Sequence, residues 1–327
     1  PEEAVSGTIP YLTICFLGIP FITAYNIISS IFRGMGDSKS PMYFIAIACA
    51  FNIALDYLFI GLLGFGPAGA ALGTTLSQTI SVLISLTMIC RKKMIPGFRF
   101  SDLKPVRTMM GGLLKIGFPI AMQDGFIQIA FIVITIIANR RGLNDAAAVG
   151  IVEKMISLFF LVPSSMLSTV SALSAQNIGA GKHERASQTL ACATTIAVSY
   201  GIVVSILMQF AGSTAVGLFS SDADVIRLVT QYLHSYIWDC IFAGIHFCFS
   251  GYFCAYGQSG ISFLHNIISV LCARIPLAYL ASKYVPDNLF PMGCAAPAGS
   301  LLSVVICVAA FIWMKRKLPV FQSGENA

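Results

Sequence analysis

Long apolar stretches separated by short polar breaks account for almost the whole chain. Nine stretches approach or exceed the ~20 residues that a helix needs to cross a bilayer. They cover residues 9–31, 42–63, 68–90, 112–138, 146–171, 190–219, 228–253, 262–281 and 292–314. A single segment in lipid satisfies its backbone hydrogen bonds only as a helix. We therefore predict an all-α integral membrane protein with nine transmembrane helices.

The polar break at residues 32–41 has a weaker copy later in the chain. It reads FRGMGDSKSP, and residues 253–262 read FCAYGQSGIS between two further apolar stretches. The residues that define the first break are Arg33, Gly34, Gly36 and Asp37. Glycine tolerates the backbone angles of a tight turn, and charged side chains need water. We predict a solvent-exposed turn at residues 32–41 and a related turn at residues 253–262.

The repeat extends into the helices that follow each turn. Residues 52–57 align with 274–279, and residues 91–93 align with 315–317. Each copy comprises three helices, and both copies begin on the same side of the membrane, as in parallel transporter repeats. The helices between the copies have no partner in this chain. We therefore expect two six-helix halves, with three more helices before residue 1.

Composition and charge agree with a membrane protein and orient it. The chain is 57% hydrophobic and 10% charged, whereas soluble domains average roughly 25% charged residues. With nine spans, 14 of the 20 Lys and Arg residues fall on one set of alternate connections. By the positive-inside rule this set faces the cytoplasm. We predict a multi-pass plasma (inner) membrane protein with residues 32–41 and the C-terminus in the cytoplasm, and residue 1 outside.

The chain is expected to divide into four parts. Residues 1–93 form the last three helices of an N-terminal lobe, and residues 94–109 form a cytoplasmic linker between the lobes. Residues 110–318 form a complete six-helix C-terminal lobe, and residues 319–327 form a short cytoplasmic tail. This division predicts nine helices of a twelve-helix, two-lobe protein.

Enzyme and metal motifs are missing from the sequence. The His183–Glu184 pair resembles the start of a zinc-protease helix, but Ser187 stands where the second histidine would be. The ten cysteines occur singly, nearly all inside apolar stretches, which is typical of small buried residues. We predict a protein that is not an enzyme, with no cofactor, no metal site and no nucleic-acid partner.

Ionisable and amide side chains inside the predicted spans are the candidates for chemistry. A charge at the bilayer centre costs ~2.5–3.5 kcal/mol on insertion scales, so such a residue needs a partner, a cavity or a proton. The candidates are Asn52, Asp56, Gln123, Asp124, Gln128, Glu153, Lys154, Asp239, His246 and Arg274.

Asp124 is the favoured member of this set. Asp124 and Gln128 lie one helical turn apart, with Gln123 adjacent, and all three follow Pro119. A proline can bend a transmembrane helix, and the bend frees carbonyl groups and makes a polar niche. We expect Asp124, supported by Gln128, to exchange a proton or Na⁺ for a substrate.

Each of the other candidates could act in transport or have a structural role. Asp239 and His246 are seven residues apart on one helix face, and the pattern fits transport chemistry and structural packing equally. Glu153 and Lys154 lie about two turns from the outer end of their span, where a structural, water-facing role is favoured over coupling. The same two interpretations apply to Asn52, Asp56 and Arg274.

Several of these segments together resemble the multidrug and toxic compound extrusion (MATE) family. The segments are residues 32–41, the Asn52 to Asp56 stretch, and residues 175–186 with Gln176, Asn177, Gly179 and Gly181. The resemblance covers nearly all of the chain. It implies helices four to twelve of a twelve-helix antiporter, which expels organic, often cationic, compounds in exchange for Na⁺ or H⁺. It also implies a protein that is monomeric when full length.

Two departures from the family pattern concern the coupling residues. The acidic first helix of the family is not in this chain, and Asp124 lies four residues nearer Pro119 than the family's acid on helix seven. Asp239 lies about one turn before the family's helix-ten position, which holds Ala243 here. The resemblance therefore leaves the choice between Na⁺ and H⁺ open.

Two alternatives to the antiporter remain at this stage. A lipid-linked saccharide flippase of the same superfamily would need a strongly cationic cavity, and only Lys154 and Arg274 are basic within the spans. The second alternative is a membrane fragment that does not transport and serves as a structural partner. The expected partners of the antiporter are a small organic substrate and the lipid bilayer.

Overall fold

The computed structural model describes residues 2–92, 104–219 and 222–317. The chain forms two compact units, Pro1–Lys104 and Pro105–Ala327, and each unit is described by itself. Most of the predicted linker at residues 94–109 and all of the predicted tail at residues 319–327 lie outside the described residues.

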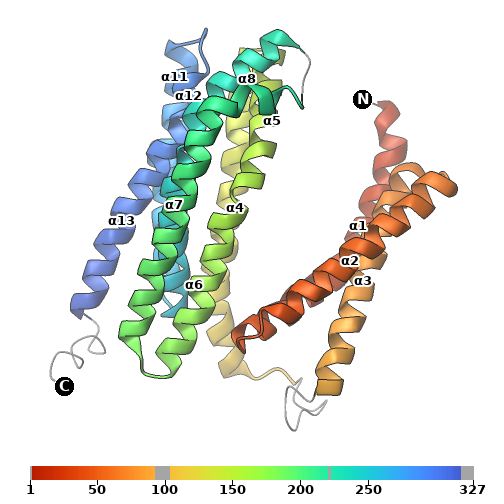
Figure 1. The fold of residues 1–327 in the computed structure, drawn as a ribbon, viewed down its shortest axis with the longest axis vertical. Helices are drawn as coiled ribbons and strands as arrows, with labels where there is room; N and C mark the ends of the chain where they lie inside the picture. Colours follow the sequence, from red (N-terminus) through yellow and green to blue (C-terminus); the bar gives the residue numbers. More distant parts are fainter. Residues whose placement is uncertain (1, 93–103, 220–221, 318–327) are drawn as a thin grey trace. The chain divides into compact units, whose positions relative to one another are not determined.

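The described residues confirm a helical, multi-pass membrane protein (Figure 1). Seven helices are long and apolar enough to cross a membrane, and two bent helix pairs raise the number to nine if each pair is one span. The predicted spans at residues 146–171 and 228–253 need correction, because each is two helices bent by 42° and 43° respectively.

The first unit contains three helices: α1 (Glu2–Gly34), α2 (Lys39–Asp56) and α3 (Gly66–Lys92). A π-helical turn, Tyr57–Leu62, extends α2. α3 packs along both α1 and α2. The close approach of α1 to α3 depends on Gly18, because a Cβ there would lie 2.8 Å from Thr75 Oγ1.

The turn between α1 and α2 has the same geometry as its copy in the second unit. Gly36 has φ 88° and Gly257 has φ 71°, the left-handed region that favours glycine. The amide of Asp37 donates to the Phe32 carbonyl at 2.9 Å, and that of Gln258 to Phe253 at 2.8 Å. Both are the long-range bond of a Schellman helix end. The predicted turns are therefore confirmed at both positions.

Asp37 gives the first turn an additional function that its copy lacks. Its carboxylate accepts hydrogen bonds from the amides of Lys39 (3.1 Å) and Ser40 (3.0 Å), and from Ser40 Oγ (2.6 Å). These amides belong to the first turn of α2 and have no partner within the helix. Asp37 thus caps α2.

The second unit holds the remaining helices (Figure 1). They are α4 (Arg107–Arg141), α5 (Leu143–Phe159), α6 (Leu161–Gly179), α7 (His183–Val216), α8 (Ala223–Tyr236), α9 (Asp239–Ala255), α10 (Ser259–Ser269), α11 (Ile275–Tyr284), α12 (Phe290–Gly293) and α13 (Ala295–Lys317). A π-helical turn, Val270–Arg274, joins α10 to α11.

Local sequence accounts for where these spans break. Pro163 lies in the first turn of α6, where its missing N–H leaves no helical bond unmade. Asp239 opens α9 and complements the positive end of the helix dipole. α4, in contrast, continues as one helix through Pro119. The breaks in the backbone therefore lie on α5–α6 and α8–α9 and not beside Asp124.

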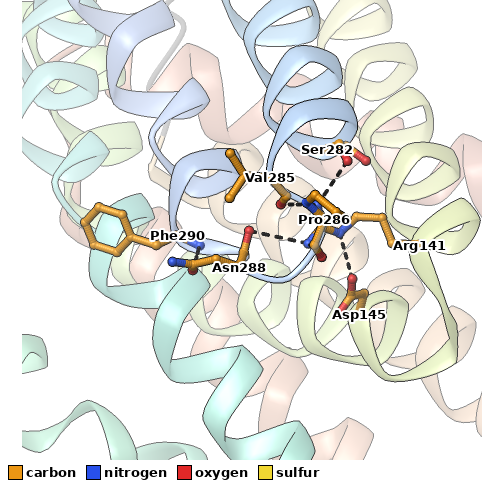
Figure 2. Close-up of polar contacts among 7 residues, drawn as sticks. All are labelled: Arg141, Asp145, Ser282, Val285, Pro286, Asn288 and Phe290. Atoms are coloured by element: carbon orange, nitrogen blue, oxygen red, sulfur yellow. Dashed lines mark hydrogen bonds and ion pairs between the residues drawn. The ribbon is translucent and has the colours of Figure 1, made fainter.

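Arg141 at the end of α4 joins two connections of the second unit (Figure 2). Its Nε lies 2.7 Å from Asp145 Oδ2, and its side chain is 5% exposed. Its other nitrogens donate to the carbonyl oxygens of Ser282, Val285, Pro286 and Asn288. These four carbonyls lie at the end of α11 and in the loop that follows, so one side chain fixes that loop against the α4–α5 turn.

We expect Arg141→Ala to lower the free energy of unfolding by about 2–4 kcal/mol, because the largely buried Asp145 carboxylate loses its ion-pair partner and four carbonyl groups lose a donor at the same time. Arg141→Lys should recover little, since an ammonium group lacks the planar fork that reaches several acceptors. Thermal unfolding in detergent measures both effects. The neighbouring Arg140 is exposed, and Arg140→Ala is the matched control that should leave unfolding unchanged. Equal shifts for the two alanine variants would contradict this assignment.

Candidate functional site

A cavity of about 370 Å³ lies within the second unit. Its wall includes residues from α4, α5, α8, α9, α10 and α13. Phe160 at the α5–α6 break, Asp239 at the α8–α9 break and Arg274 in the π-helical turn all line it. Irregular backbone within a membrane is tolerated where it is covered by protein or lines a cavity. The three irregular points of the unit thus meet at one place.

Asp239 and Arg274 form a buried ion pair in this wall. Arg274 Nη2 lies 2.7 Å from Asp239 Oδ2, and their side chains are 14% and 0% exposed. Ser300 on α13 lies beside the carboxylate. The sequence analysis selected both residues but did not predict that they pair.

Small residues on α13 make room for Arg274. A Cβ at Gly299 would lie 3.2 Å from the Arg274 Cβ and 3.0 Å from Ser269 Oγ. Asp56 in the first unit has a corresponding neighbour, because a Cβ at Gly73 would collide with its carboxylate oxygen. An ionisable residue near a π-helical turn packs on a glycine of the next helix in both units.

Glu153 and Lys154 on α5 also line the cavity. Glu153 is half-buried, and Thr135 Oγ1 on α4 lies 3.5 Å from its Oε1. Lys154 is exposed and takes no part in the ion pairs found among the described residues. The cavity thereby contains two carboxylates and two fixed cations. The structural and the coupling interpretation of both residues remain predictions.

His246 is a further titratable side chain of the wall. It is 5% exposed, and its Nδ1 has no hydrogen-bond partner among the described residues. Its ring packs edge-on against Phe247 and against His265, with ring centroids 4.8 and 5.6 Å apart. His265 was not among the sequence candidates, although its position inside a predicted span could have marked it.

The favoured group around Asp124 does not assemble at this cavity. Gln128 lines the wall, but Asp124 is exposed and is not part of it. Gln123 is buried on α4, and its Oε1 has no partner among the described residues. Pro119, one turn earlier, is half-buried within the continuous helix. The role expected for Asp124 remains a prediction.

Two polar side chains of the first unit also lack partners. Asn52 Nδ2 and Asp56 Oδ1 are buried without a hydrogen bond among the described residues. They are four residues apart near the end of α2, so they share one helix face. Their orphaned atoms mark an unsatisfied polar position on this face of α2.

The residues of the family motifs in segments 32–41 and 175–186 lie where helices end. Gly179 ends α6, and Gly181 adopts φ 74° after it. The Gln176 carbonyl accepts from the Ala180 amide, and the Asn177 carbonyl accepts from the Lys182 amide at 2.8 Å. Arg33 at the corresponding end of α1 donates to Ser30 Oγ at 3.1 Å. These residues terminate helices and lie apart from the cavity wall.

Comparison with protein families and curated proteins yields consistent matches. A family model described as MatE matches residues 1–58 and 119–280. The probable multidrug resistance proteins YpnP and YoeA of Bacillus subtilis (strain 168) are 31% and 26% identical to this chain, over 90% and 97% of its length. A protein named FAD transporter, from Shewanella oneidensis, is 26% identical over 91% of it. The chain spans 65% of YpnP, 71% of YoeA and 66% of the FAD transporter.

Solved structures share the fold. A MATE crystal structure in a straight conformation aligns with 98% of this chain, at a TM-score of 0.89 and 21% sequence identity. The Vibrio cholerae MATE transporter VcmN aligns with 91% of the chain, at a TM-score of 0.84 and 15% identity. The chain covers 72% and 67% of those structures.

Proposed function

This chain belongs to the MatE family, and from that premise we propose that it acts in a secondary active antiporter. The antiporter exports organic, cationic compounds in exchange for Na⁺ or H⁺. The observation that most supports this proposal is the buried Asp239–Arg274 ion pair. The pair lies where three irregular helices meet at one cavity. The names of the Bacillus subtilis relatives, which refer to multidrug resistance, support export of drug-like compounds.

The physical argument rests on the cost of the buried charges. A buried ion pair is weak support for stability, because desolvation offsets much of its attraction. Ionisable residues inside a membrane protein therefore most often mark an ion or substrate pathway. An entering ion competes with Arg274 for Asp239, and Glu153 gives it a second carboxylate in the same cavity. Inward movement of one positive charge releases ~2.3 kcal/mol per 100 mV, which can drive export.

The bends on either side of the cavity supply a way to alternate its access. The α5–α6 and α8–α9 pairs are bent by 42° and 43° where they line the cavity. Discontinuous helices of this kind form transporter binding sites, and access alternates when one helical lobe moves against the other around the fixed site. We also propose that residues 32–41 and the C-terminus lie in the cytoplasm. The protein would then be a plasma-membrane protein that is monomeric when full length.

A flippase fits this site less well. Transport of a lipid-linked saccharide with phosphate groups calls for unpaired cations in the cavity. Among the described residues of the wall, Asp239 pairs with Arg274, and Glu153 lies within electrostatic range of Lys154, so both cations have a carboxylate nearby. The antiporter is therefore the proposal that we carry forward.

The test uses full-length protein in everted membrane vesicles, with ethidium as a fluorescent organic cation. We expect Glu153→Gln and Asp239→Asn to reduce ion-driven ethidium uptake at least about tenfold. Each substitution keeps the size of the side chain and removes only its charge, and Glu153→Gln leaves the ion pair intact. Protein levels in the vesicles are compared by immunoblot.

Asp124→Asn is the matched control, because it removes a carboxylate of α4 that does not line the cavity. On the cavity assignment this variant should keep more than half of wild-type uptake, whereas the role predicted for Asp124 from the sequence requires that uptake be lost. If Asp124→Asn abolishes coupled uptake while Glu153→Gln and Asp239→Asn retain it, coupling occurs at Asp124 and the cavity assignment is wrong.

A further inference from the structure

A groove between α4 and α11 lies on the second unit, near the helix ends that Arg141 holds together. Its volume is about 430 Å³. Two exposed cations line one end of it, Arg140 in the last turn of α4 and Lys283 in the last turn of α11. The rest of the groove is mainly aliphatic and includes Val133, Ile136, Ile137 and Ile275.

The two helices present the same order of side chains along this α4–α11 groove. On α11, Ile275, Tyr279 and Lys283 follow at four-residue spacing, so they share one helix face. On α4, the matching series runs from Val133 to Arg140. The eight residues on α11 correspond to about 12 Å of helix, and one leaflet is about half of the ~30 Å hydrocarbon core. The groove thus has a charged end at the interface and an aliphatic part at the depth of acyl chains.

The two cations of the groove pair with no carboxylate among the described residues. Arg140 and Lys283 take no part in the ion pairs found there. Asp145 pairs with Arg141, and Asp287 in the loop after α11 forms no ion pair with Lys283. The charged end of the groove therefore keeps two positive charges that no side chain in the described part of the protein neutralises.

The carbonyl groups at the end of α11 already have a donor and do not need these cations. A helix ends in unpaired carbonyls with partial negative charge. Arg141 donates to the carbonyl oxygens of Ser282 and Val285 (Figure 2). Lys283 Nζ lies 5.6 Å from the centroid of the Tyr284 ring, a cation–π contact that leaves its charge in place. A negatively charged ligand is the partner that this end of the groove lacks.

We propose that the α4–α11 groove binds one anionic glycerophospholipid. Its phosphate lies between Arg140 and Lys283, and an acyl chain lies along the aliphatic part. Basic pockets between transmembrane helices bind the head groups of anionic lipids, and charge-assisted hydrogen bonds from guanidinium and ammonium groups suit a phosphate. Lipid binding needs no ion coupling, so this site does not depend on the proposed antiport function.

Other occupants fit the groove less well. An organic cation would be repelled by Arg140 and Lys283. A phosphatidylcholine has the same phosphate, but its choline group brings a third positive charge to the same place. Arg and Lys at helix ends can also extend to the interface without binding a particular lipid, and that behaviour would produce no tightly held lipid.

The first experiment is native mass spectrometry of the full-length protein, delipidated in detergent and titrated with phosphatidylglycerol or phosphatidylcholine. We expect the wild type to retain one phosphatidylglycerol, with at least about tenfold preference over phosphatidylcholine. Arg140→Gln combined with Lys283→Gln should lower the affinity for phosphatidylglycerol at least about tenfold. Both side chains are exposed, so the delipidated double variant should unfold at the wild-type temperature.

Two further double variants separate charge in the groove from charge in general. Lys115→Gln with Arg227→Gln removes the same charge from exposed positions outside the groove, and it should keep the wild-type affinity for phosphatidylglycerol. Arg140→Lys with Lys283→Arg keeps both charges of the groove and should bind within about threefold of the wild type.

A second experiment locates the lipid in nanodiscs that contain the full-length protein. The probe is a phosphatidylglycerol with a photoactivatable group in one acyl chain, and peptide mass spectrometry maps the label. We expect the label at Ile136 and Tyr279, which are exposed and line the groove. Excess phosphatidylglycerol should suppress this labelling, and excess phosphatidylcholine should not.

Three results would overturn the proposal. The first is a wild type that retains no more phosphatidylglycerol than phosphatidylcholine, which is also expected if another part of the full-length protein or a second copy fills the groove. The second is an equal loss of affinity from the glutamine variants inside and outside the groove. The third is labelling spread evenly over exposed apolar residues of the second unit. Ethidium transport enters none of these measurements, so failure of the antiporter proposal would leave them unaffected.

Discussion

Replacement of Arg274 by glutamine is expected to lower the free energy of unfolding of the second unit by about 3–5 kcal/mol, the usual cost of leaving one charge of a buried pair without its partner. Asp239 is fully buried, and Arg274 is its only ion-pair partner among the described residues. Glutamine can still donate a hydrogen bond, but it cannot balance the carboxylate charge. Thermal unfolding in detergent, with yield in the membrane fraction as a second measure, records the loss.

A double variant separates charge from packing. Asp239→Asn combined with Arg274→Gln removes both charges, and we expect it to recover more than half of the lost stability, because no uncompensated charge remains. Transport should stay low, since the carboxylate is absent.

An exposed pair serves as the control. Arg227 and Asp224 are 65% and 72% exposed and lie 3.7 Å apart, and Arg227→Gln should change the unfolding free energy by less than about 0.5 kcal/mol. A cost for Arg274→Gln as small as that of Arg227→Gln would show that the buried pair does not hold the fold together.

Gly251→Ala is the second substitution expected to have a large effect. A Cβ at Gly251 would overlap the carbonyl oxygen of Leu167 and lie 3.1 Å from the Ser171 amide nitrogen. Both atoms are backbone atoms of α6, so a change of rotamer cannot relieve the clash and the two helices must separate. We expect a loss of about 1–3 kcal/mol or more, in line with the cost of overpacked cores.

Gly150 on α5 provides a control of opposite sign. It lies in a helix, and a Cβ there would meet nothing within 4 Å. Alanine restricts the unfolded chain more than glycine does, so Gly150→Ala should stabilise the protein by about 0.4–1 kcal/mol. The two alanine variants are compared by thermal unfolding in one detergent. A stable Gly251→Ala variant would mean that α6 and α9 do not depend on this close approach.

The nine spans could be predicted because membrane thickness sets their length directly. The bends could not be predicted, because α5 and α6 form one apolar stretch of sequence and Phe160 gives no sign of a break there. Pro163 is the local signal, yet Pro119 is the same residue type inside a helix that continues. Whether a proline breaks a span depends on the helices packed against it, which the sequence does not describe.

The site was only partly predictable for a similar reason. Charge inside an apolar span selected Asp239, Arg274, Glu153 and Lys154, and all four line the cavity. The pairing of Asp239 with Arg274 depends on the bend before α9 and on the π-helical turn that places Arg274. His265 was not selected, although its place inside a predicted span is a signal; its contacts with Ser250 of α9 and Ser303 of α13 could not be predicted from the sequence.

The turns at residues 32–41 and 253–262 differ in their basic residues, and this difference affects the order in which the chain enters the membrane. The first carries its own Arg33 and Lys39, so the cytoplasmic position that we propose for it would be decided as soon as it leaves the ribosome. The second shares the left-handed glycine and the helix-ending hydrogen bond but has no basic residue, and the nearest downstream cluster in the sequence is at residues 315–317. The α9–α10 hairpin is therefore expected to reach its final topology only after α13 has been synthesised.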